Sequence, residues 1–137
     1  MVDVSKKGRE IEQQLFSQPL FEVVAKLSYF RRLERAYQLI EAEYADPKLN
    51  LEQAARVSGA NKNHLNTLFR QTTNFTFHQF LIRYRLLKAI NMMKAKNYSL
   101  LEVALQNGFG SLSTFERNFR RVLGIAPKQF KGNRDLW

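Results

Sequence analysis

Residues 50–80 read NLEQAARVSGANKNHLNTLFRQTTNFTFHQF, and residues 99–130 read SLLEVALQNGFGSLSTFERNFRRVLGIAPKQF. The two stretches are copies of one pattern, because similar residues recur 49 positions apart up to a shared glycine and 50 positions apart after it. The matching pairs are Asn50 and Ser99, Leu51 and Leu100, Gln53 and Glu102, Ala55 and Ala104, Gly59 and Gly108, Leu65 and Phe115, Phe69 and Phe119, Arg70 and Arg120, Asn74 and Gly124, Gln79 and Gln129, and Phe80 and Phe130. The repeat predicts two structurally equivalent units.

Each copy begins with the signature of a helix start. Asn50 and Ser99 are favoured N-cap residues, and Gln53 and Glu102 follow them at the spacing of a capping box. In a capping box the two side chains satisfy backbone amides that the first helical turn leaves without partners. We therefore expect one helix to begin after Asn50 and another after Ser99.

A glycine then predicts a tight turn in each copy. Gly59 and Gly108 lie about two helical turns after the N-caps, where a short helix ends and the chain turns. A second helix follows, with apolar residues three or four positions apart on one face. These residues are Leu65, Leu68 and Phe69 in the first copy and Phe115, Phe119 and Val122 in the second. Asn74 and Gly124 tolerate a positive φ and are expected to end these second helices.

Between the copies, residues 77 to roughly 96 predict one uninterrupted helix of about 20 residues, or about 30 Å. A helix of this length would hold the two units about 30 Å apart. Its expected inward residues are Phe80, Tyr84, Leu87 and Ile90. Its expected outward residues are Arg83, Arg85, Lys88 and Lys94.

Further helices are expected before the repeat. One helix carries Leu33, Tyr37, Ile40 and Tyr44 and ends at the turn around Asp46 and Pro47. Upstream, one or two extra helices, broken near Pro19, are suggested by a set of apolar residues. The set is Ile11, Leu15, Phe16, Phe21, Val24, Leu27 and Phe30.

The chain has 137 residues and a formal net charge of +10, and the excess lies in its second part. Residues 53–137 hold 14 basic and 3 acidic residues, and no acid lies between Glu52 and Glu102. A surface of this kind attracts polyanions. The chain has no cysteine, which excludes disulfides and thiolate metal sites, and it has no apolar run of about 20 residues that would span a bilayer. We therefore expect a cytoplasmic, nucleoid-associated protein without a membrane partner, cofactor or metal.

The second helix of each unit presents a polar face opposite its apolar stripe. In the first unit this face holds Asn63, Asn66, Thr67 and Arg70, and in the second it holds Ser113, Glu116, Arg117 and Arg120, with Lys62, Thr114 and Arg121 beside the two stripes. Asn pairs with adenine, Arg with guanine and Glu with cytosine, and the methyl group of Thr meets thymine. The candidates for base contacts are Asn63, Asn66, Thr67, Glu116 and Arg117.

Other residues are expected to meet phosphates. Basic and hydroxyl side chains lie near the ends of the second helices, and amides lie at the starts of the first helices. The candidates for phosphate contacts are Lys62, Arg70, Ser111, Arg120, Arg121, Asn50 and Ser99. His64 and His78 are isolated in the sequence, so no catalytic residue is predicted and the chain is not expected to be an enzyme.

At residues 33–131 the chain resembles the DNA-binding domain of the AraC/XylS family of bacterial transcription regulators. The most specific motif is Ala104, Gly108-Phe109, Phe115, Phe119-Arg120, Gly124, Pro127 and Phe130. The first unit matches at Leu51, Ala55, Leu65, Phe69-Arg70 and Phe80, and the linker matches at Arg85-Leu86, Ala89 and Met92-Met93.

The resemblance implies an all-α fold of two three-helix helix-turn-helix subdomains joined by a long linker helix and preceded by the extra helices. The expected division is 1–32 as an N-terminal helical extension or interdomain linker remnant, 33–75 as the first subdomain, 76–97 as the linker helix, and 98–137 as the second subdomain. By analogy, base contacts in the second unit fall on Ser113, Thr114 and Arg117. The implied partners are promoter or operator DNA and, because the family leans towards activation, RNA polymerase.

The sequence departs from the family pattern at three positions. Asn74 stands where the family often has Gly, and its tolerance of left-handed backbone accommodates this. Gly110 replaces a frequent Ser, which leaves Ser111 to cap the second helix. Leu112 replaces a commonly polar residue at the start of that helix. The expected consequence is either a contact with a thymine methyl group or a second unit that discriminates less between DNA sequences.

Two alternatives remain open at this point. The chain is a short regulator or a part of a larger one, fused to an enzyme or to a ligand-sensing domain, although these residues leave no room for an effector-binding barrel. The other alternative is a non-specific architectural or RNA-binding protein. Such proteins use apolar wedges or exposed aromatic platforms, and the polar stripes contain neither.

Overall fold

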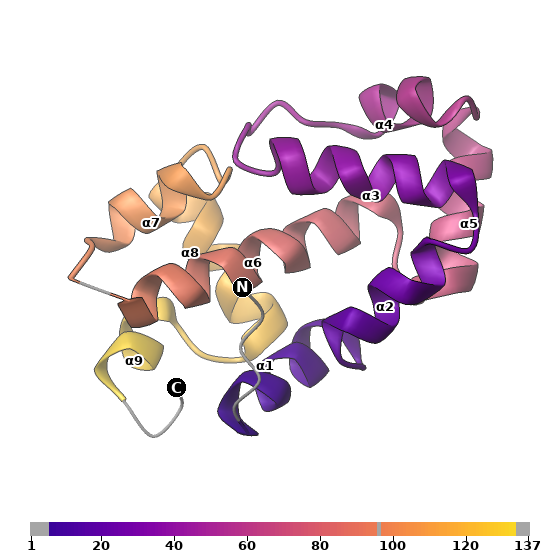
Figure 1. Cartoon of the computed structure of the whole chain (residues 1–137). Coiled ribbons are helices and arrows are strands. Elements are labelled where there is room, and N and C mark those ends of the chain that lie inside the picture. Colours follow the sequence, from indigo (N-terminus) through magenta and orange to yellow (C-terminus); the bar gives the residue numbers. More distant parts are fainter. Residues whose placement is uncertain (1–5, 96, 134–137) are drawn as a thin grey trace.

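The computed structural model describes residues 6–95 and 97–133, and within these residues every regular element is a helix. The helices are α1 (Lys6–Phe16), α2 (Leu20–Leu27), α3 (Arg31–Glu43), α4 (Leu51–Ser58), α5 (Lys62–Thr73), α6 (Phe77–Ala95), α7 (Leu100–Gln106), α8 (Leu112–Leu123) and α9 (Pro127–Gly132). Lobe 1 consists of α3, α4 and α5, and lobe 2 consists of α7, α8 and α9. The long helix α6 runs between them, as Figure 1 shows. This confirms the predicted all-α fold.

The predicted capping boxes start the first helix of each unit. The Asn50 side chain accepts a hydrogen bond from the Gln53 amide at 2.9 Å, and the Gln53 side chain accepts one from the Asn50 amide at 3.0 Å. Ser99 and Glu102 make the equivalent pair at 3.1 and 3.2 Å. Each box satisfies two amides that lack an intrahelical partner, so these short helices begin at defined residues.

The turn glycines and the helix ends also match the sequence expectation. Gly59 ends α4 with φ 71°, and Gly108 lies in the turn after α7 with φ 85°. Asn74 and Gly124 end α5 and α8 in the left-handed conformation, with φ 69° and 81°. These are the positions where the chain must reverse after a helix, and only residues that tolerate positive φ fit them well.

Both lobes pack their apolar stripes into one continuous core. Leu65 and Phe69 of α5, like Phe115 and Phe119 of α8, have no exposed surface. Leu68 and Val122, which were predicted to share these stripes, are only partly buried. The rings of Phe69 and Phe119 each lie less than 6 Å from a phenylalanine in the following helix, namely Phe80 at 5.7 Å and Phe130 at 5.6 Å. The apolar stripes therefore hold α5 and α8 in place with their polar faces outward.

The two extra N-terminal helices, α1 and α2, are both present, and Pro19 lies at the break between them. Five of the seven apolar residues that predicted them pack in or against the core. Phe21 and Phe30 do not, because 66% and 53% of their surfaces are exposed. Residues 1–5 of the expected N-terminal extension, and residues 134–137 of the expected second subdomain, lie outside the described residues.

One prediction about helix α6, the outward direction of Arg85, is wrong. The helix ends at Ala95, and Lys96, where the helix was expected to end, lies outside the described residues. Arg85 was expected to point outward, but it is buried with 4% exposure. Its Nε donates to the carbonyl of Tyr44 at 2.7 Å, and its guanidinium also donates to the carbonyl of Asp46 at 2.8 Å. Helical periodicity did not reveal this role, because the two carbonyls come from the turn after α3.

The buried Arg85 guanidinium lies where the two lobes meet. A Cβ atom added to Gly108 would lie 2.2 Å from the Tyr44 carbonyl oxygen and 2.6 Å from Arg85 Nε. Burial lowers the pKa of Arg85 to about 10, against the opposing effect of the Asp46 carboxylate, so this guanidinium stays charged at neutral pH. The turn after α3 in lobe 1, which Arg85 binds, and the turn before α8 in lobe 2 thus lie against each other beside this one side chain of α6.

Candidate nucleic-acid interface

The second helix of lobe 1, α5, presents a polar face that solvent can reach. Asn61 caps the helix by accepting a hydrogen bond from the His64 amide at 2.8 Å. The buried Leu65 and Phe69 then fix the rotation of the helix about its axis. The face opposite them forms a shallow open depression lined by Asn63, Asn66, Thr67, Arg70 and Gln71. Four of the predicted contact residues of the first unit therefore lie side by side.

The equivalent helix of lobe 2, α8, has the same construction. Ser111 caps it by accepting a hydrogen bond from the Thr114 amide at 3.1 Å, as the sequence predicted. Its exposed face forms a second shallow depression, which is lined by Ser113, Glu116, Arg117, Arg120, Arg121 and Ala126. Five of the predicted contact residues of the second unit are thus together on one surface.

Some of the predicted contact residues already make hydrogen bonds within the protein. The Asn66 side-chain oxygen accepts from the Phe77 amide at the start of α6, at 3.0 Å. The Thr114 hydroxyl accepts from the Ser111 hydroxyl at 2.9 Å. Asn66 and Thr114 are also less exposed than Asn63 and Ser113. Their side chains are therefore less available for a ligand than the sequence pattern suggested.

The two N-cap residues predicted to meet phosphates are also engaged. The backbone amides of Asn50 and Ser99 donate to the Gln53 and Glu102 side chains within the capping boxes. Helix geometry leaves the following two amides of each helix without an intrahelical partner. In α4 these belong to Leu51 and Glu52, which are the groups at this helix start that suit an anion.

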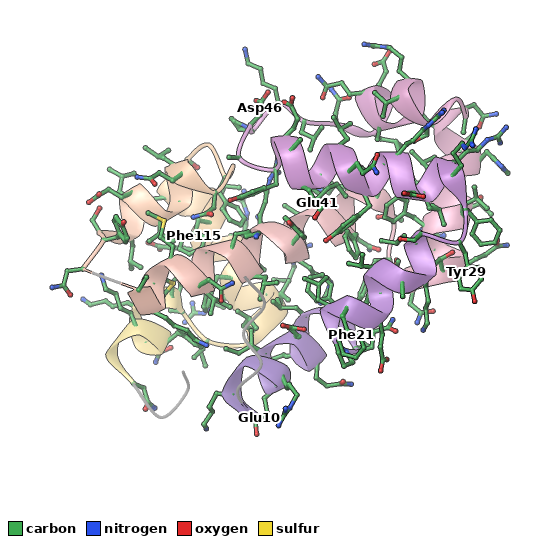
Figure 2. All side chains as sticks on the ribbon, viewed as in Figure 1. Glu10, Phe21, Tyr29, Glu41, Asp46 and Phe115 are labelled. Carbon is green, nitrogen blue, oxygen red and sulfur yellow. The ribbon has the colours of Figure 1, made fainter. Side chains whose placement is uncertain are left out.

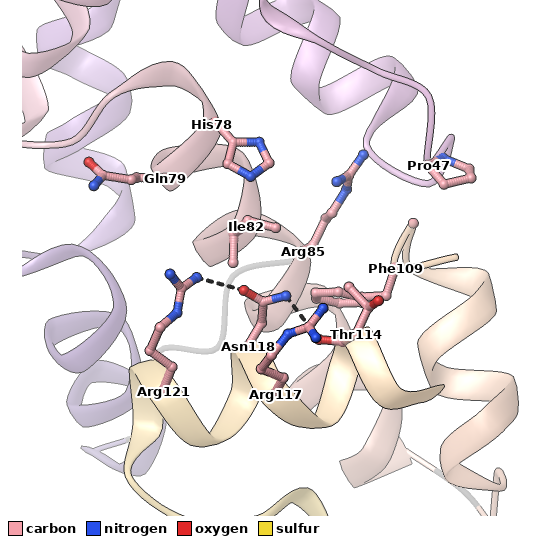
Figure 3. Close-up of a pocket in the computed structure, with 11 residues that line it drawn as sticks. Pro47, His78, Gln79, Ile82, Arg85, Phe109, Thr114, Arg117, Asn118 and Arg121 are labelled. Atoms are coloured by element: carbon pink, nitrogen blue, oxygen red, sulfur yellow. Dashed lines mark hydrogen bonds between the residues drawn. The ribbon is translucent and has the colours of Figure 1, made fainter. Parts of the chain in front are cut away.

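A cleft of about 450 Å³ lies between α6 and α8 and was not predicted from the sequence. Figure 3 shows Thr114, Arg117, Asn118 and Arg121 on the α8 side and His78, Gln79, Ile82 and Arg85 on the α6 side. The turn residues Pro47, Gly108 and Phe109 complete the lining. None of the described residues that line the cleft is acidic.

The electrostatics of this cleft favour an anion. Its wall carries Arg117 and Arg121, and Arg121 is oriented by a 2.6 Å hydrogen bond from its guanidinium to the Asn118 side-chain oxygen. Partial burial lowers the pKa of His78, and the nearby positive charges of Arg85 and Arg121 lower it further. An anion in the cleft would offset these charges and raise the pKa of His78 again.

His78, Gln79 and Asn118 are therefore site residues that the sequence analysis missed. His78 and Asn118 lie 40 positions apart in the chain, and only the packing of α6 beside α8 brings them to one cleft. No motif in the sequence relates them. Arg117 and Arg121 line both the cleft and the exposed face of α8, so the two surfaces are continuous.

Other kinds of site find no support in the described part of the chain. No group of three or more His, Asp or Glu side chains among these residues has the arrangement to hold a metal ion. Of the helices described, none is both long and apolar enough to cross a membrane.

The comparisons with known proteins agree on the type of domain. A family model described as "Helix-turn-helix domain" matches residues 54–133. The chain is 32% identical over 85 residues to "Probable transcription factor PqrA" of Proteus vulgaris, which covers 62% of this chain and 70% of the relative. It is 27% identical over 105 residues to "Putative HTH-type transcriptional regulator YkgA" of Escherichia coli. That aligned region covers 77% of this chain and only 43% of the relative.

Among solved structures, the fold is similar to that of the DNA-binding domain of AdpA, a global transcriptional factor, which was crystallised in complex with a target DNA. The TM-score is 0.68 and the sequence identity 26%, over 74% of this chain and 90% of that chain. The helices that carry the two polar faces thus belong to a known architecture.

Proposed function

The chain belongs to the AraC/XylS family of helix-turn-helix transcription regulators, and from this premise we propose that it binds double-stranded DNA sequence-specifically through α5 and α8. Each helix enters one of two adjacent segments of the major groove, which is the docking geometry of a recognition helix. The proposed role is binding rather than catalysis. The proposed location of the protein is the bacterial cytoplasm, where the DNA lies.

One observation carries this proposal. Two helices have the same kind of side-chain N-cap, an equivalent buried stripe and an equivalent exposed polar face, and a cationic cleft lies beside the second of them, between α8 and α6, with no acid among the described residues that line it. Major-groove reading needs polar side chains on a rigid helix, and the backbone between two groove segments needs cations. The protein presents both requirements, the polar faces on α5 and α8 and the cationic lining of the cleft beside α8.

We assign base contacts to the most accessible side chains of the two polar faces. These are Asn63 and Thr67 on α5, and Ser113, Glu116 and Arg117 on α8. Asn66 and Thr114 stay in the predicted set of base contacts. However, both are only partly exposed, and each must keep or exchange an internal hydrogen bond when it meets a base, so we expect them to discriminate less than Thr67 and Ser113, which are exposed although their hydroxyls also have partners within the protein.

We assign phosphate contacts to the positive groups around these faces and to the helix starts. Lys62, Arg70, Arg120 and Arg121 supply charge, Ser111 supplies a hydroxyl, and Asn50 and Ser99 mark the helix starts whose next amides face the backbone. His78 joins this set because it lies opposite Arg121 in the cleft. We expect the DNA backbone next to the groove segment read by α8 to lie against this cleft.

Because the two faces carry different residues, one chain should read an asymmetric site. We propose that such a site lies in a promoter or operator and that binding activates transcription, with RNA polymerase as the partner. This proposal is supported by the family to which the chain belongs, which leans towards activation. Its test is transcription from a promoter that contains the selected site, with and without the protein.

The DNA-binding proposal is tested by selecting bound sequences from a random duplex pool. We expect one asymmetric consensus with two conserved blocks, and a preference of roughly 10³-fold over random duplex at physiological salt. Equal competition by random duplex and by single-stranded RNA would contradict sequence-specific DNA binding. A consensus with a single block would contradict the use of both helices.

A further inference from the structure

The two N-terminal helices contact both lobes, and they lie entirely before the region matched by the helix-turn-helix family model. We call residues 6–27 the N-terminal strap. In Figure 1, α1 runs beneath α6 and α2 continues towards α5. The strap therefore extends along the side of the molecule from α8 to α5, the two helices that carry the polar faces.

At one end, the strap is attached to lobe 2. Helix α1 packs against α6 and α8. The Gln14 side chain donates a 3.1 Å hydrogen bond to the carbonyl of Leu123, the last residue of α8. Ile11 is buried, and it faces Leu123, Ile125 and Phe130 across a small hollow of about 290 Å³. Helix α1 thus holds the C-terminal end of α8.

At the other end, the strap is attached to lobe 1. Helix α2 packs against α3 and α5, with Val23 and Leu27 buried. The Arg83 guanidinium of α6 donates to the Leu15 carbonyl at 2.8 Å, and it also lies 4.2 Å above the ring of Phe75. Phe75 belongs to the short turn between α5 and α6. The strap is therefore connected to the recognition helix of lobe 1 directly and through Arg83.

The strap is also rigid at its own corner. The carboxylate of Glu12 is buried with 2% exposure and accepts a 2.7 Å hydrogen bond from the amide of Leu20, the first residue of α2. Phe16, at the end of α1, has its ring 5.3 Å from that of Phe80 in α6. Because the corner is buried and hydrogen-bonded, we expect α1 and α2 to keep their relative orientation.

From these contacts we infer that the N-terminal strap is a positioning element, which fixes the distance and orientation between the two recognition helices before DNA arrives. Without it, the main connections between the lobes among the described residues would be α6 and the meeting of the turns at Arg85. A stiff connection between two binding units raises the effective concentration of the second unit once the first has bound. The strap would therefore increase affinity and restrict the accepted spacing between the two halves of the site, without itself contacting a base.

The first test measures the separation of the lobes without DNA. The chain has no cysteine, so Arg56→Cys in α4 and Gln106→Cys in α7 place two spin labels at exposed positions on different lobes. With an intact strap we expect one narrow distance distribution. Ile11→Asp, which places a charge at the contact with lobe 2, should broaden it. Phe21→Asp places the same charge at an exposed position of α2 and serves as the control, which should leave the distribution narrow.

Gln14→Ala is the milder variant, because it removes only the hydrogen bond to the Leu123 carbonyl. It should broaden the distribution by a smaller amount than Ile11→Asp. If circular dichroism shows that Ile11→Asp has unfolded the whole chain, Gln14→Ala decides the question alone. A distribution as narrow as that of the control in a folded strap variant would overturn the inference.

The second test uses DNA and rests on the proposed function. One base pair inserted between the two blocks of the selected site rotates one block by about 35° relative to the other. We expect the intact protein to lose roughly tenfold or more in affinity, as for a mismatched site, and Ile11→Asp to lose only about threefold or less. Equal losses would overturn the inference. If the protein shows no sequence preference at all, the proposed function fails. The spin-label distances, which are measured without DNA, still show whether the strap fixes the separation of the lobes.

Discussion

Individual side chains on the two polar faces differ in how free they are to meet a ligand. Asn63 and Arg117 are exposed, whereas the oxygen of Asn66 is shared with the Phe77 amide. A side chain that already has a partner gains less from a new one, because the new hydrogen bond replaces an old one. At the scale of the residue, exposure and existing partners rank the candidates within each face.

Arg117→Ala should reduce affinity for the selected site by about 1–3 kcal/mol and affinity for random duplex by much less. The reason is that a guanidinium paired with a guanine edge contributes to discrimination. Binding titrations with both DNAs measure the difference. The same loss on both duplexes would assign Arg117 to the backbone instead.

Arg70→Ala should weaken binding to the selected site and to random duplex alike. It should also reduce the dependence of log K on log salt by about one counterion, because one phosphate contact is lost. Titrations at several salt concentrations, with Arg117→Ala measured in parallel, separate the two roles. An unchanged salt slope would contradict a phosphate contact at Arg70.

His78 should make DNA binding stronger at lower pH. Its pKa is lowered in the free protein by partial burial and by Arg85 and Arg121, and a bound phosphate would raise it. At pH values between the pKa of His78 in the free protein and its higher pKa in the complex, DNA binding is accompanied by the uptake of a proton. The affinity for DNA therefore rises as the pH falls through this range. The gain is up to about tenfold for each unit by which the phosphate raises the pKa.

The measurement is affinity between about pH 8 and 5.5, for the wild type and for His78→Gln. His64→Gln is the control, because the other histidine lies on α5 outside the cleft. We expect His78→Gln to remove most of the dependence of DNA affinity on pH and His64→Gln to leave this dependence unchanged. A profile that persists in His78→Gln would show that the proton is taken up elsewhere.

At the scale of the element, each recognition helix is defined by its ends and by its buried stripe. Ser111 and Gly124 bound α8 as Asn61 and Asn74 bound α5, so both helices are 12 residues long. Leu65 and its equivalent, Phe115, are completely buried. The stripe sets the rotation of the helix about its axis and therefore decides which polar residues face outward.

Leu65→Ala should lower the free energy of unfolding by about 2–5 kcal/mol, because it leaves a cavity in the core of lobe 1. Chemical denaturation measures this change. Leu101→Ala is the matched control, since Leu101 is 49% exposed and its loss should cost under about 0.5 kcal/mol. Equal stability of the two variants would contradict the rotation assigned to α5.

At the scale of the whole molecule, contacts on two sides of α6 hold the lobes together. On one side Arg85 and Gly108 join the turn after α3 to the turn before α8. On the other side the N-terminal strap touches both recognition helices. A protein that reads two groove segments needs such contacts, because the spacing of DNA is fixed.

Gly108→Ala should destabilise the protein by about 2–4 kcal/mol, since it combines left-handed strain with a clash against the Tyr44 carbonyl. Gly124→Ala has a similar φ of 81° but no atom within 4 Å of the added Cβ, so it isolates the strain alone. We expect it to cost about 1–2 kcal/mol. If thermal or chemical denaturation found equal losses, the contact between the turns would not contribute to stability.

The sequence by itself determined the local features of this protein. The capping boxes at Asn50 and Ser99, the left-handed ends at Asn74 and Gly124, and the buried faces of α5 and α8 were all predicted. Each depends on residues within one or two helical turns, so a periodic pattern is sufficient to reveal it. The internal repeat then predicted two equivalent units and the long helix between them.

Only the tertiary structure decided which distant groups meet. It buried Arg85 against the carbonyls of Tyr44 and Asp46, engaged Asn66 with the start of α6, and brought His78 into the same cleft as Arg121. It also attached the N-terminal strap to both lobes. These contacts join residues that are separated along the chain by as few as 11 and as many as 109 positions. Helical periodicity reports only which face of a helix is apolar, and the partner of a side chain is set by how the helices pack.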